Sequence, residues 1–408
     1  MARRLDTDAK LRQRASTVVP GGMYGHMDMR PMPDGYPQFM QSGAGARLRD
    51  ADGNSYLDFM CGWGPVVLGR RHPRVEAAVA RQLAEGDCLN GPSPVMVDLA
   101  ELIVDTVPHA DWALLAKNGT DATTLCVTIA RAATGRRKVL LARGAYHGAA
   151  PWCTPRPAGT LPEDRAHLAY FSYNDVASLR AAVAEAGDDL AAVVVCPVRQ
   201  DTFREQELAD PAFAREVRAV CSAAGAVMVL DDVRCGFRLD VGGSWEPLGV
   251  RPDLAAWSKA IANGYALAAV TGTDALRDAA TAVFTTGSFW FSAVSMAAAV
   301  ATIRELRETD ALARMAATGR QLRDGLAAQA AAHGLAVRQT GPVQMPLLTF
   351  AGDDDFRLAR AWTREAVSRG VYLHPWHNWF LSAAHTADDV TEALACTDEA
   401  FAAVRTER

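Results

Sequence analysis

The chain has 408 residues, 50% of them hydrophobic and 22% charged, which is an ordinary globular composition with length for about two to three domains' worth of core. Lys and Arg together number 42 against 47 Asp and Glu, a formal charge of −5 with no basic run, and this argues against nucleic acid as a partner. The polar N-terminus does not read as a signal peptide, and no apolar run approaches the ~20 residues of a membrane helix, so we expect a cytoplasmic protein without a membrane partner.

The eight cysteines stand singly, with no C-x-x-C pair. Most lie inside apolar runs, where buried reduced thiols are the simpler interpretation. The sequence therefore indicates neither a disulfide framework nor a zinc site.

Residues 1–70 are rich in Gly, Pro and Met and predict an arm followed by a short hairpin around Asp52-Gly53. Short apolar runs then alternate with helical patterns. The predicted strands are Trp112–Ala116, Val139–Ala142, Ala192–Cys196, Ala226–Leu230 and Ala268–Thr271. Helical patterns between them include Asp121–Ala133 before Gly135 and Pro211–Ala224 before Gly225, with the glycines at helix ends.

This order predicts an α/β fold with a mostly parallel sheet flanked by helices, in which ligands sit at the carboxyl ends of the strands. Three further helical patterns and a strand-like LLTF follow, at Val294–Arg307, Ala311–His333, Phe356–Arg369 and Leu347–Phe350. We expect a large domain over 71–293 and a smaller α+β domain formed by 1–70 together with 294–408.

Two charged side chains stand directly after apolar runs. Asp231 follows AVMVL, where an acid is costly to bury unless it meets a cation or a hydrogen-bond donor; a helix cap or a solvated loop acid is the alternative. Lys259 follows the run that ends at Trp257, and desolvation favours its neutral, nucleophilic amine, which suits Schiff-base chemistry. The alternative is a lysine that reaches solvent from a helix end.

Two further segments fall at strand ends. In KNGTDATT, Gly119 permits close backbone approach, and the free N–H groups of a helix start with the Thr120 hydroxyl would bind an anion such as phosphate; a plain N-cap is equally compatible. In AYHG, Tyr146 and His147 bring an aromatic face and an imidazole to the same edge, although such a pair is more often packing.

These four signals together match the needs of one ligand. Pyridoxal 5′-phosphate takes a phosphate anchor, a ring-stacking face, a partner for the pyridine nitrogen and a lysine for the Schiff base. The sequence therefore predicts that Lys259 forms a covalent imine with this coenzyme.

The chain resembles the class III aminotransferases, which are fold type I pyridoxal-phosphate enzymes, and within them the glutamate-1-semialdehyde aminomutase branch. The resemblance runs from PGG at Pro20 to SAAHTADDV ending at Val390. It rests on the blocks DADGNSYLDF, CGWGPVVLGRRHP, KNGTDATT, TGRRKVLLARGAYHG, LDDVRCGFR, PDLAAWSKAIANG and FLSAAH. It implies the fold of that family, with a large cofactor-binding domain.

The resemblance also implies roles for single residues. Lys259 would hold the cofactor and move the proton during transfer, and Asp231 would pair with the pyridine nitrogen. Val233 and Tyr146 would cover the two ring faces. The phosphate would be held by Asn118, Gly119 and Thr120. In GSFWFSA, Ser288 takes the place of the family's threonine, which reaches the phosphate from the partner subunit, so a homodimer with shared active sites is implied.

Departures from the family pattern concern the substrate. Asp28 stands where the aminomutase branch carries a carboxylate-binding arginine, so glutamate-1-semialdehyde is a doubtful substrate. The nearest arginine is Arg30, and CPVRQD gains Arg199 where the family has E-P-V-x-G-N. We expect Arg199 or Arg30 to have taken over carboxylate binding.

Aromatic residues have been added around the expected site. Trp290 lies beside Ser288, Trp63 matches a family tryptophan near the entrance, and HPWHNWF carries His374 and His377. An H-x-x-H pair without a third ligand is a poor metal site, so we predict no metal. Walls of a substrate channel are the favoured interpretation, and packing is the alternative.

The sequence thus predicts an aminotransferase that moves an amino group from a small-molecule donor to a carbonyl acceptor, in specialised biosynthesis. One alternative is an intramolecular 2,1-aminomutase, which needs no external donor. The other is a catalytically silent paralogue that keeps the scaffold for binding. The presence of Lys259, Asp231 and Tyr146 together argues against the silent paralogue.

Overall fold

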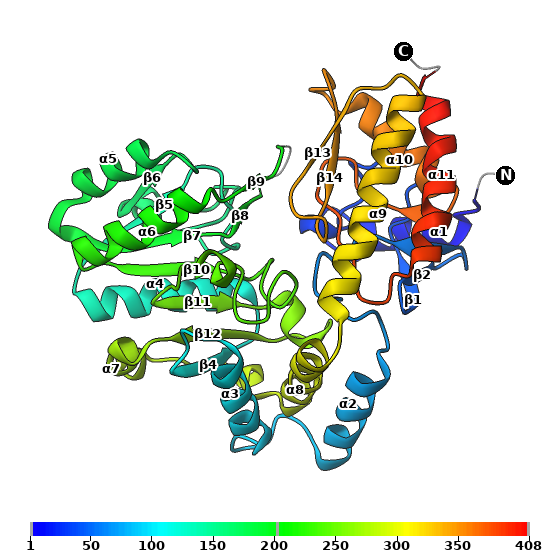
Figure 1. The fold of residues 1–408 in the computed structure, drawn as a ribbon. Helices are drawn as coiled ribbons and strands as arrows, with labels where there is room; N and C mark the ends of the chain where they lie inside the picture. Colours follow the sequence, from blue (N-terminus) through cyan, green and yellow to red (C-terminus); the bar gives the residue numbers. More distant parts are fainter. Residues whose placement is uncertain (1–2, 201–203, 406–408) are drawn as a thin grey trace. The chain divides into compact units, whose positions relative to one another are not determined.

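The computed structural model describes residues 3–200 and 204–405. The chain forms two compact units (Figure 1). The large unit contains residues 73–200 and 206–312, and the small unit contains 3–72, 204–205 and 313–405. The boundary lies near 312 rather than at the expected 293, because the helix from Ala293 to Glu308 packs on two helices of the large unit.

The large unit is built on a seven-stranded sheet in the order β4-β12-β11-β10-β7-β5-β6. Its strands are β4 (Trp112–Ala116), β5 (Lys138–Ala142), β6 (Leu168–Phe171), β7 (Leu190–Val195), β10 (Val227–Asp231), β11 (Leu254–Trp257) and β12 (Ala268–Gly272). All neighbouring pairs are parallel except those of β12, which is antiparallel to β11 and β4. The predicted mostly parallel sheet is confirmed, with every predicted strand displaced by at most two residues.

Helices cover both faces of this sheet. They are α2 (Pro73–Glu85), α3 (Val95–Thr106), α4 (Gly119–Thr134), α5 (Val176–Ala186), α6 (Pro211–Ala224), α7 (Arg277–Ala282) and α8 (Ala293–Glu308). Ala192 and Val194 of β7 belong to the hydrophobic cluster beneath α4. Side chains alternate along a strand, so Ala191 and Val193 point to the other face, and they too are fully buried. Helix α6 packs on β7 and β10 and covers this second face of the sheet.

Local sequence explains where α4 and α6 begin and end. The Asp210 side chain accepts the N–H of Ala212 at 2.7 Å, Pro211 occupies the first turn, and α6 ends at Gly225 with a left-handed φ of 59°. Helix α4 starts from a capping box and ends at Gly135, also left-handed. Both helices start after a connection that leaves the carboxyl edge of the sheet, α4 after β4 and α6 after β7.

The small unit combines helices with short sheets. Its elements are α1 (Asp6–Val18), β1 (Met40–Ala44), β2 (Arg47–Asp50), β3 (Ser55–Asp58), α9 (Ala311–Ala332, which begins at the boundary), β13 (Val337–Thr340), β14 (Leu347–Phe350), α10 (Arg357–Ser368), β15 (Val371–Tyr372) and α11 (Ala387–Arg405). The predicted hairpin around Asp52-Gly53 is the antiparallel pair β2 and β3. Parallel pairing of β15 with β3 joins the two ends of the chain in one sheet.

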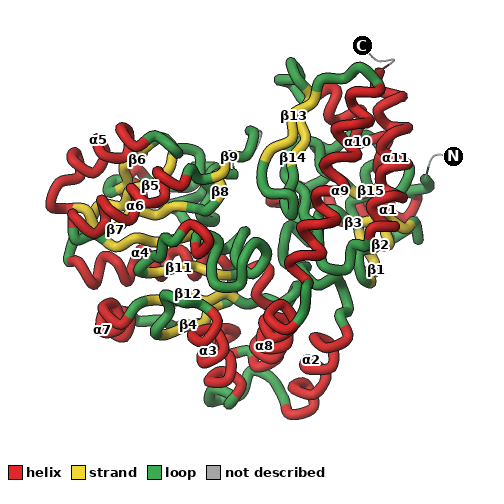
Figure 2. Tube along the Cα trace, in the orientation of Figure 1, coloured by secondary structure: helices red, strands yellow, loops and turns green. Residues whose placement is uncertain are grey.

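Loops and short helices connect the strands and longer helices of the large unit (Figure 2). A two-stranded hairpin of β8 (Val198–Arg199) and β9 (Glu207–Leu208) follows β7, and the short helices η5 (Lys259–Ala262) and η7 (Ser288–Phe291) follow β11 and α7. In the described residues, no helix is both long and apolar enough to span a bilayer.

Candidate active site

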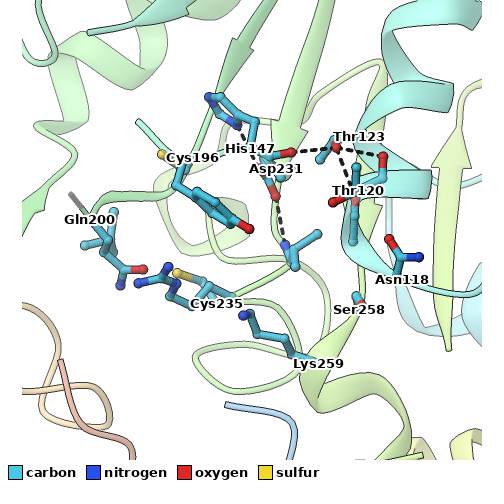
Figure 3. Close-up of a pocket in the computed structure, with 16 residues that line it drawn as sticks. Asn118, Thr120, Thr123, His147, Cys196, Gln200, Asp231, Cys235, Ser258 and Lys259 are labelled. Carbon is cyan, nitrogen blue, oxygen red and sulfur yellow. Dashed lines mark hydrogen bonds and ion pairs between the residues drawn. The ribbon is translucent and has the colours of Figure 1, made fainter. Parts of the chain in front are cut away.

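A cavity of about 160 Å³ opens at the carboxyl edge of the large sheet. Five loops contribute to it, each following a strand that runs in the same direction: β4, β5, β7, β10 and β11. The lining residues are Asn118, Gly119, Thr120, Thr123, Tyr146, His147, Gly148, Cys196, Val198, Gln200, Asp231, Val233, Arg234, Cys235, Ser258 and Lys259 (Figure 3). This is the place where a parallel α/β sheet binds its ligands.

The first wall of the cavity is the N-terminus of α4. The Asn118 side chain accepts the N–H of Asp121 at 3.1 Å, and the Asp121 carboxylate accepts the N–H of Asn118 at 3.1 Å. This capping box fixes the first turn and directs its N–H groups, with the positive end of the helix dipole, toward the cavity. The structure shows the N-cap that the sequence allowed, and the anion site at this helix start stays a prediction.

Two glycines make room around that wall. A Cβ on Gly119 would lie 2.8 Å from Cγ1 of Val233, and one on Gly148 would lie 2.6 Å from Oγ1 of Thr120. Thr120 Oγ1 also accepts the N–H of Ala149 at 3.1 Å, which fixes the hydroxyl beside the helix end. The backbone therefore forms a cradle that any larger residue would fill.

Asp231 and His147 form a hydrogen-bonded pair at the sheet end of the cavity. His147 Nδ1 lies 2.7 Å from Asp231 Oδ2, and the N–H of Val233 donates to Asp231 Oδ1 at 3.2 Å (Figure 3). Both side chains are buried, and His147 Nε2 has no hydrogen-bond partner in the described structure. The imidazole and the loop backbone thus hold the carboxylate in one orientation.

Lys259 is the first residue of η5 and reaches into the same cavity (Figure 3). Its φ of 46° is left-handed, which is strained for a residue with a side chain. The pKa of its ammonium is lowered to about 7, chiefly by burial and then by the charge of Arg234, while Asp231 opposes the shift. At neutral pH a large fraction of this amine is therefore neutral and nucleophilic.

Tyr146 and Val233 lie on separate loops that border the cavity. Burial raises the pKa of the Tyr146 phenol, so the ring stays neutral. A flat aromatic ring between them would meet one aromatic and one aliphatic surface.

Several lining residues were not predicted as site residues. His147 was noted only as an imidazole at the sheet edge, and Gln200, Arg234 and Cys235 were not proposed at all. The available signal for Arg234 was its place in LDDVRCGFR, directly after the predicted ring-packing Val233.

Three predicted residues of the large unit do not line the cavity: Ser288, Trp290 and Arg199. Ser288 is exposed at the start of η7. Trp290 is partly buried and packs against the hydrophobic cluster of the sheet. A contact of Ser288 with a partner's cofactor and a substrate role for Trp290 stay predictions.

The arginines expected to bind a carboxylate already hold carboxylates of the chain. Arg30 donates to both oxygens of Asp28, at 2.8 and 2.7 Å, within the small unit. Arg199 on β8 lies 2.8 and 2.9 Å from Glu207, and its neighbours Val198 and Gln200 line the cavity while it does not. Their substrate roles stay predictions.

Trp63 lies within a group of imidazoles in the small unit. Its ring centroid is 5.0 Å from that of His26, 5.3 Å from His374 and 4.8 Å from His377, each in an edge contact. His374 Nδ1 accepts the N–H groups of Trp376 and His377, and burial lowers the pKa of His374 to about 3. Within residues 3–200 and 204–405, no group of three or more His, Cys, Asp or Glu side chains is placed to hold a metal ion.

The cavity as a whole fits pyridoxal 5′-phosphate. The α4 cradle suits its phosphate, Tyr146 and Val233 its ring, Asp231 its pyridine nitrogen and Lys259 its aldehyde. A buried aspartate oriented by an imidazole suits a protonated ring nitrogen, because the cation offsets the cost of burying the carboxylate.

Comparisons with known proteins agree with this chemistry. The family model Aminotransferase class-III matches residues 31–398. An aminopentol aminotransferase of Sphingopyxis macrogoltabida is 52% identical over 97% of this chain and 93% of its own. The solved FumI protein of Sphingopyxis sp. MTA144, with PLP in its internal aldimine form, superposes with a TM-score of 0.96 at 51% identity, covering 98% of this chain and 97% of its own.

A glutamate-1-semialdehyde 2,1-aminomutase of Desulforudis audaxviator (strain MP104C) is only 32% identical over 96% of this chain and 97% of its own. The aminomutase branch is therefore a more distant likeness than the sequence resemblance implied. The chain therefore belongs to the class III aminotransferases and is a pyridoxal-phosphate enzyme.

Proposed function

We propose that this aminotransferase takes its amino group from a primary amine on a polyhydroxylated aliphatic chain and passes it to a carbonyl acceptor. The observation that carries the proposal is the 52% identity, over nearly the whole chain, to an enzyme named for an amine that bears five hydroxyl groups. Position 28 carries an aspartate where the aminomutase branch has a carboxylate-binding arginine, which agrees with a donor that has no carboxylate.

The residues of the cavity have distinct tasks in this reaction. When bound, pyridoxal phosphate would supply a carbonyl group that reacts with primary amines and a ring that accepts electrons. Lys259 holds the coenzyme covalently at rest and then, as a neutral amine, moves the proton from the donor carbon. The α4 cradle binds the phosphate, and Asp231, oriented by His147, keeps the ring nitrogen protonated.

The proposal is tested by presenting the purified holoenzyme with amines of different classes and with pyruvate as acceptor. The panel contains sphinganine as a hydroxylated long-chain amine, hexylamine, β-alanine, ornithine and glutamate-1-semialdehyde. Alanine formation with sphinganine, at a kcat/KM at least about tenfold above that of the amino acids, is expected.

Two other outcomes would contradict the proposal, and each would identify a different function. Isomerisation of glutamate-1-semialdehyde without an acceptor would identify an aminomutase. A protein that binds the coenzyme at Lys259 but transfers from no amine would be a silent paralogue.

We also infer that the protein works as a homodimer with shared active sites. Ser288, which the family resemblance assigns to the partner's phosphate, lies on a segment that exposes Phe284, Phe289 and Phe291 at 89%, 64% and 39%. Three exposed aromatic side chains within eight positions favour a surface that a second copy covers.

A further inference from the structure

One amide side chain of the cavity has no task in holding the coenzyme and uses only part of its hydrogen-bonding capacity within the chain. Gln200 lines the cavity at the end of the hairpin of β8 and β9, and only 7% of it is exposed. We propose that Gln200 binds a hydroxyl group of the amino donor, on the carbon next to the one that carries the amine. The inference rests on the proposed function and narrows its donor to a 1,2-amino alcohol.

The hairpin holds the Gln200 side chain in one place. Arg199 lies opposite Glu207 in the register of the two strands, and their side chains form an ion pair with N···O distances of 2.8 and 2.9 Å. One position further along, Gln200 Nε2 donates to Gln206 Oε1 at 2.8 Å, and both amides are buried. A side chain that is already ordered loses little further freedom when a ligand binds to it.

The bond to Gln206 leaves the other end of the Gln200 amide for a ligand. Among the residues that the structure describes, no group donates to the Gln200 carbonyl oxygen. In Figure 3 this oxygen lies on the side of the amide toward Cys235, and the nitrogen points away from it. A buried carbonyl oxygen without a donor is costly, so a substrate group that donates to it is favoured.

A hydroxyl group is the substituent that matches this amide. It donates to the carbonyl oxygen and can also accept from the second N–H of the amide. A carboxylate has no hydrogen to donate, and an ammonium group would add a further cation to a cavity that Arg234 and Lys259 line. The neighbouring wall of Cys196 and Val198 offers no hydrogen bond of comparable strength, so Gln200 carries the recognition.

The size of the cavity places this hydroxyl close to the amine. Gln200 and Lys259 line the same cavity of about 160 Å³, in which only the first carbons of a long donor fit beside the coenzyme. The donor amine must reach the coenzyme at Lys259, so a hydroxyl that contacts Gln200 stands on a nearby carbon. A hydroxyl on the amine-bearing carbon itself would form an unstable hemiaminal, and the adjacent carbon is therefore the first that can carry it.

The test compares two donors that differ by a single hydroxyl, 2-aminooctadecan-3-ol and 2-aminooctadecane, with the holoenzyme and pyruvate. Gln200→Leu removes the amide at nearly equal volume, and Gln13→Leu is the matched control, because Gln13 is an exposed glutamine of α1. A double variant, Gln200→Leu with Gln206→Leu, replaces both buried amides, so that Gln206 is not left without this partner. Coenzyme absorbance shows that each variant is loaded.

In the wild-type enzyme we expect kcat/KM for the amino alcohol to exceed that for the plain amine roughly tenfold or more, because the plain amine leaves the Gln200 oxygen buried without a donor. In Gln200→Leu and in the double variant, a loss for the amino alcohol should bring the two donors within about threefold of each other. Gln13→Leu should keep the wild-type ratio.

A wild-type ratio near one, a ratio unchanged in both Gln200 variants, or transfer from sphinganine but not from the amino alcohol would overturn the inference and leave the proposed function in place. A loaded enzyme that transfers from none of these amines, sphinganine included, would overturn the proposed function, and the inference with it.

Discussion

At the residue scale, Lys259 shows how burial sets reactivity. Its pKa of about 7 means that the neutral amine is present above pH 7, whereas an exposed lysine becomes neutral only near pH 10.4. The strained φ of 46° indicates that the surroundings hold the residue in place against a local cost.

We predict that the rate at which the coenzyme attaches to the apo protein rises with pH through about 7 and levels off above pH 8. The reason is that the nucleophile is the unprotonated amine. Attachment is measured by imine absorbance, and borohydride reduction followed by digestion should place the pyridoxyl group on the peptide with Ser258–Gly264. A midpoint near pH 10, or a label on another peptide, would contradict this assignment, and Lys259→Met should show no labelling.

The orientation of the Asp231 carboxylate depends on its hydrogen bond with His147. His147→Phe removes the 2.7 Å contact, and we predict a loss in kcat of about 10- to 100-fold with KM nearly unchanged, because the carboxylate no longer holds one position. Single-turnover absorbance measurements give the rate, and His147→Asn should recover part of it. If instead the variant melts at a lower temperature but the folded fraction is fully active, the pair is only structural.

At the element scale, the first turn of α4 is both a capped helix start and the proposed phosphate site. Its capping box satisfies the N-terminal backbone, and Gly119 allows the first turn to approach Val233. A methyl group at this position costs the helix nothing, since alanine is the better helix former, so any effect of the substitution must come from the cavity.

We therefore predict that Gly119→Ala weakens coenzyme binding more than about tenfold while thermal stability of the apo protein stays within about 1 kcal/mol. The added Cβ lies 2.8 Å from Val233, which must move into the cavity. Spectroscopic titration of the apo protein with pyridoxal phosphate gives the affinity. Gly91→Ala, where a Cβ would meet open space and φ is ordinary, is the matched control, and equal affinity in both variants would show that the cradle is not the phosphate site.

At the scale of the whole molecule, the shared active site can be tested by mixing two inactive proteins. Lys259→Ala lacks the nucleophile, and Ser288→Trp would block the phosphate of the partner. If the site is shared, each mixed dimer regains one intact site, and random exchange of subunits restores about a quarter of normal activity, since half of the dimers are mixed and half of their sites intact. A mixture without activity, with mixed dimers shown by mass spectrometry, would place Ser288 in its own subunit's site.

The sequence alone predicted those features of the fold and of the cavity that depend on a local residue pattern. Asp231 and Lys259 stood out because a charge beside an apolar run is unusual, and the start of α4 because its cap residues form a recognisable order. The antiparallel direction of β12 was not predicted, because a short apolar run such as AAVTG carries no sign of direction. The bond between His147 and Asp231 joins residues 84 positions apart, which no local pattern reveals. Arg234 was missed for a related reason, since a charged residue after a strand looks like a solvated loop until the cavity is known.

The reversal at β12 also bears on the dynamics of catalysis. Because β11 and β12 are antiparallel neighbours, the segment that carries Lys259 is a tight connection anchored at both ends in one sheet. Strand pairing on both sides restrains the backbone of this connection, and rotations about the lysine's own side-chain bonds take picoseconds to nanoseconds. We therefore expect Lys259 to return to the coenzyme after each turnover by side-chain rotation, without a backbone rearrangement.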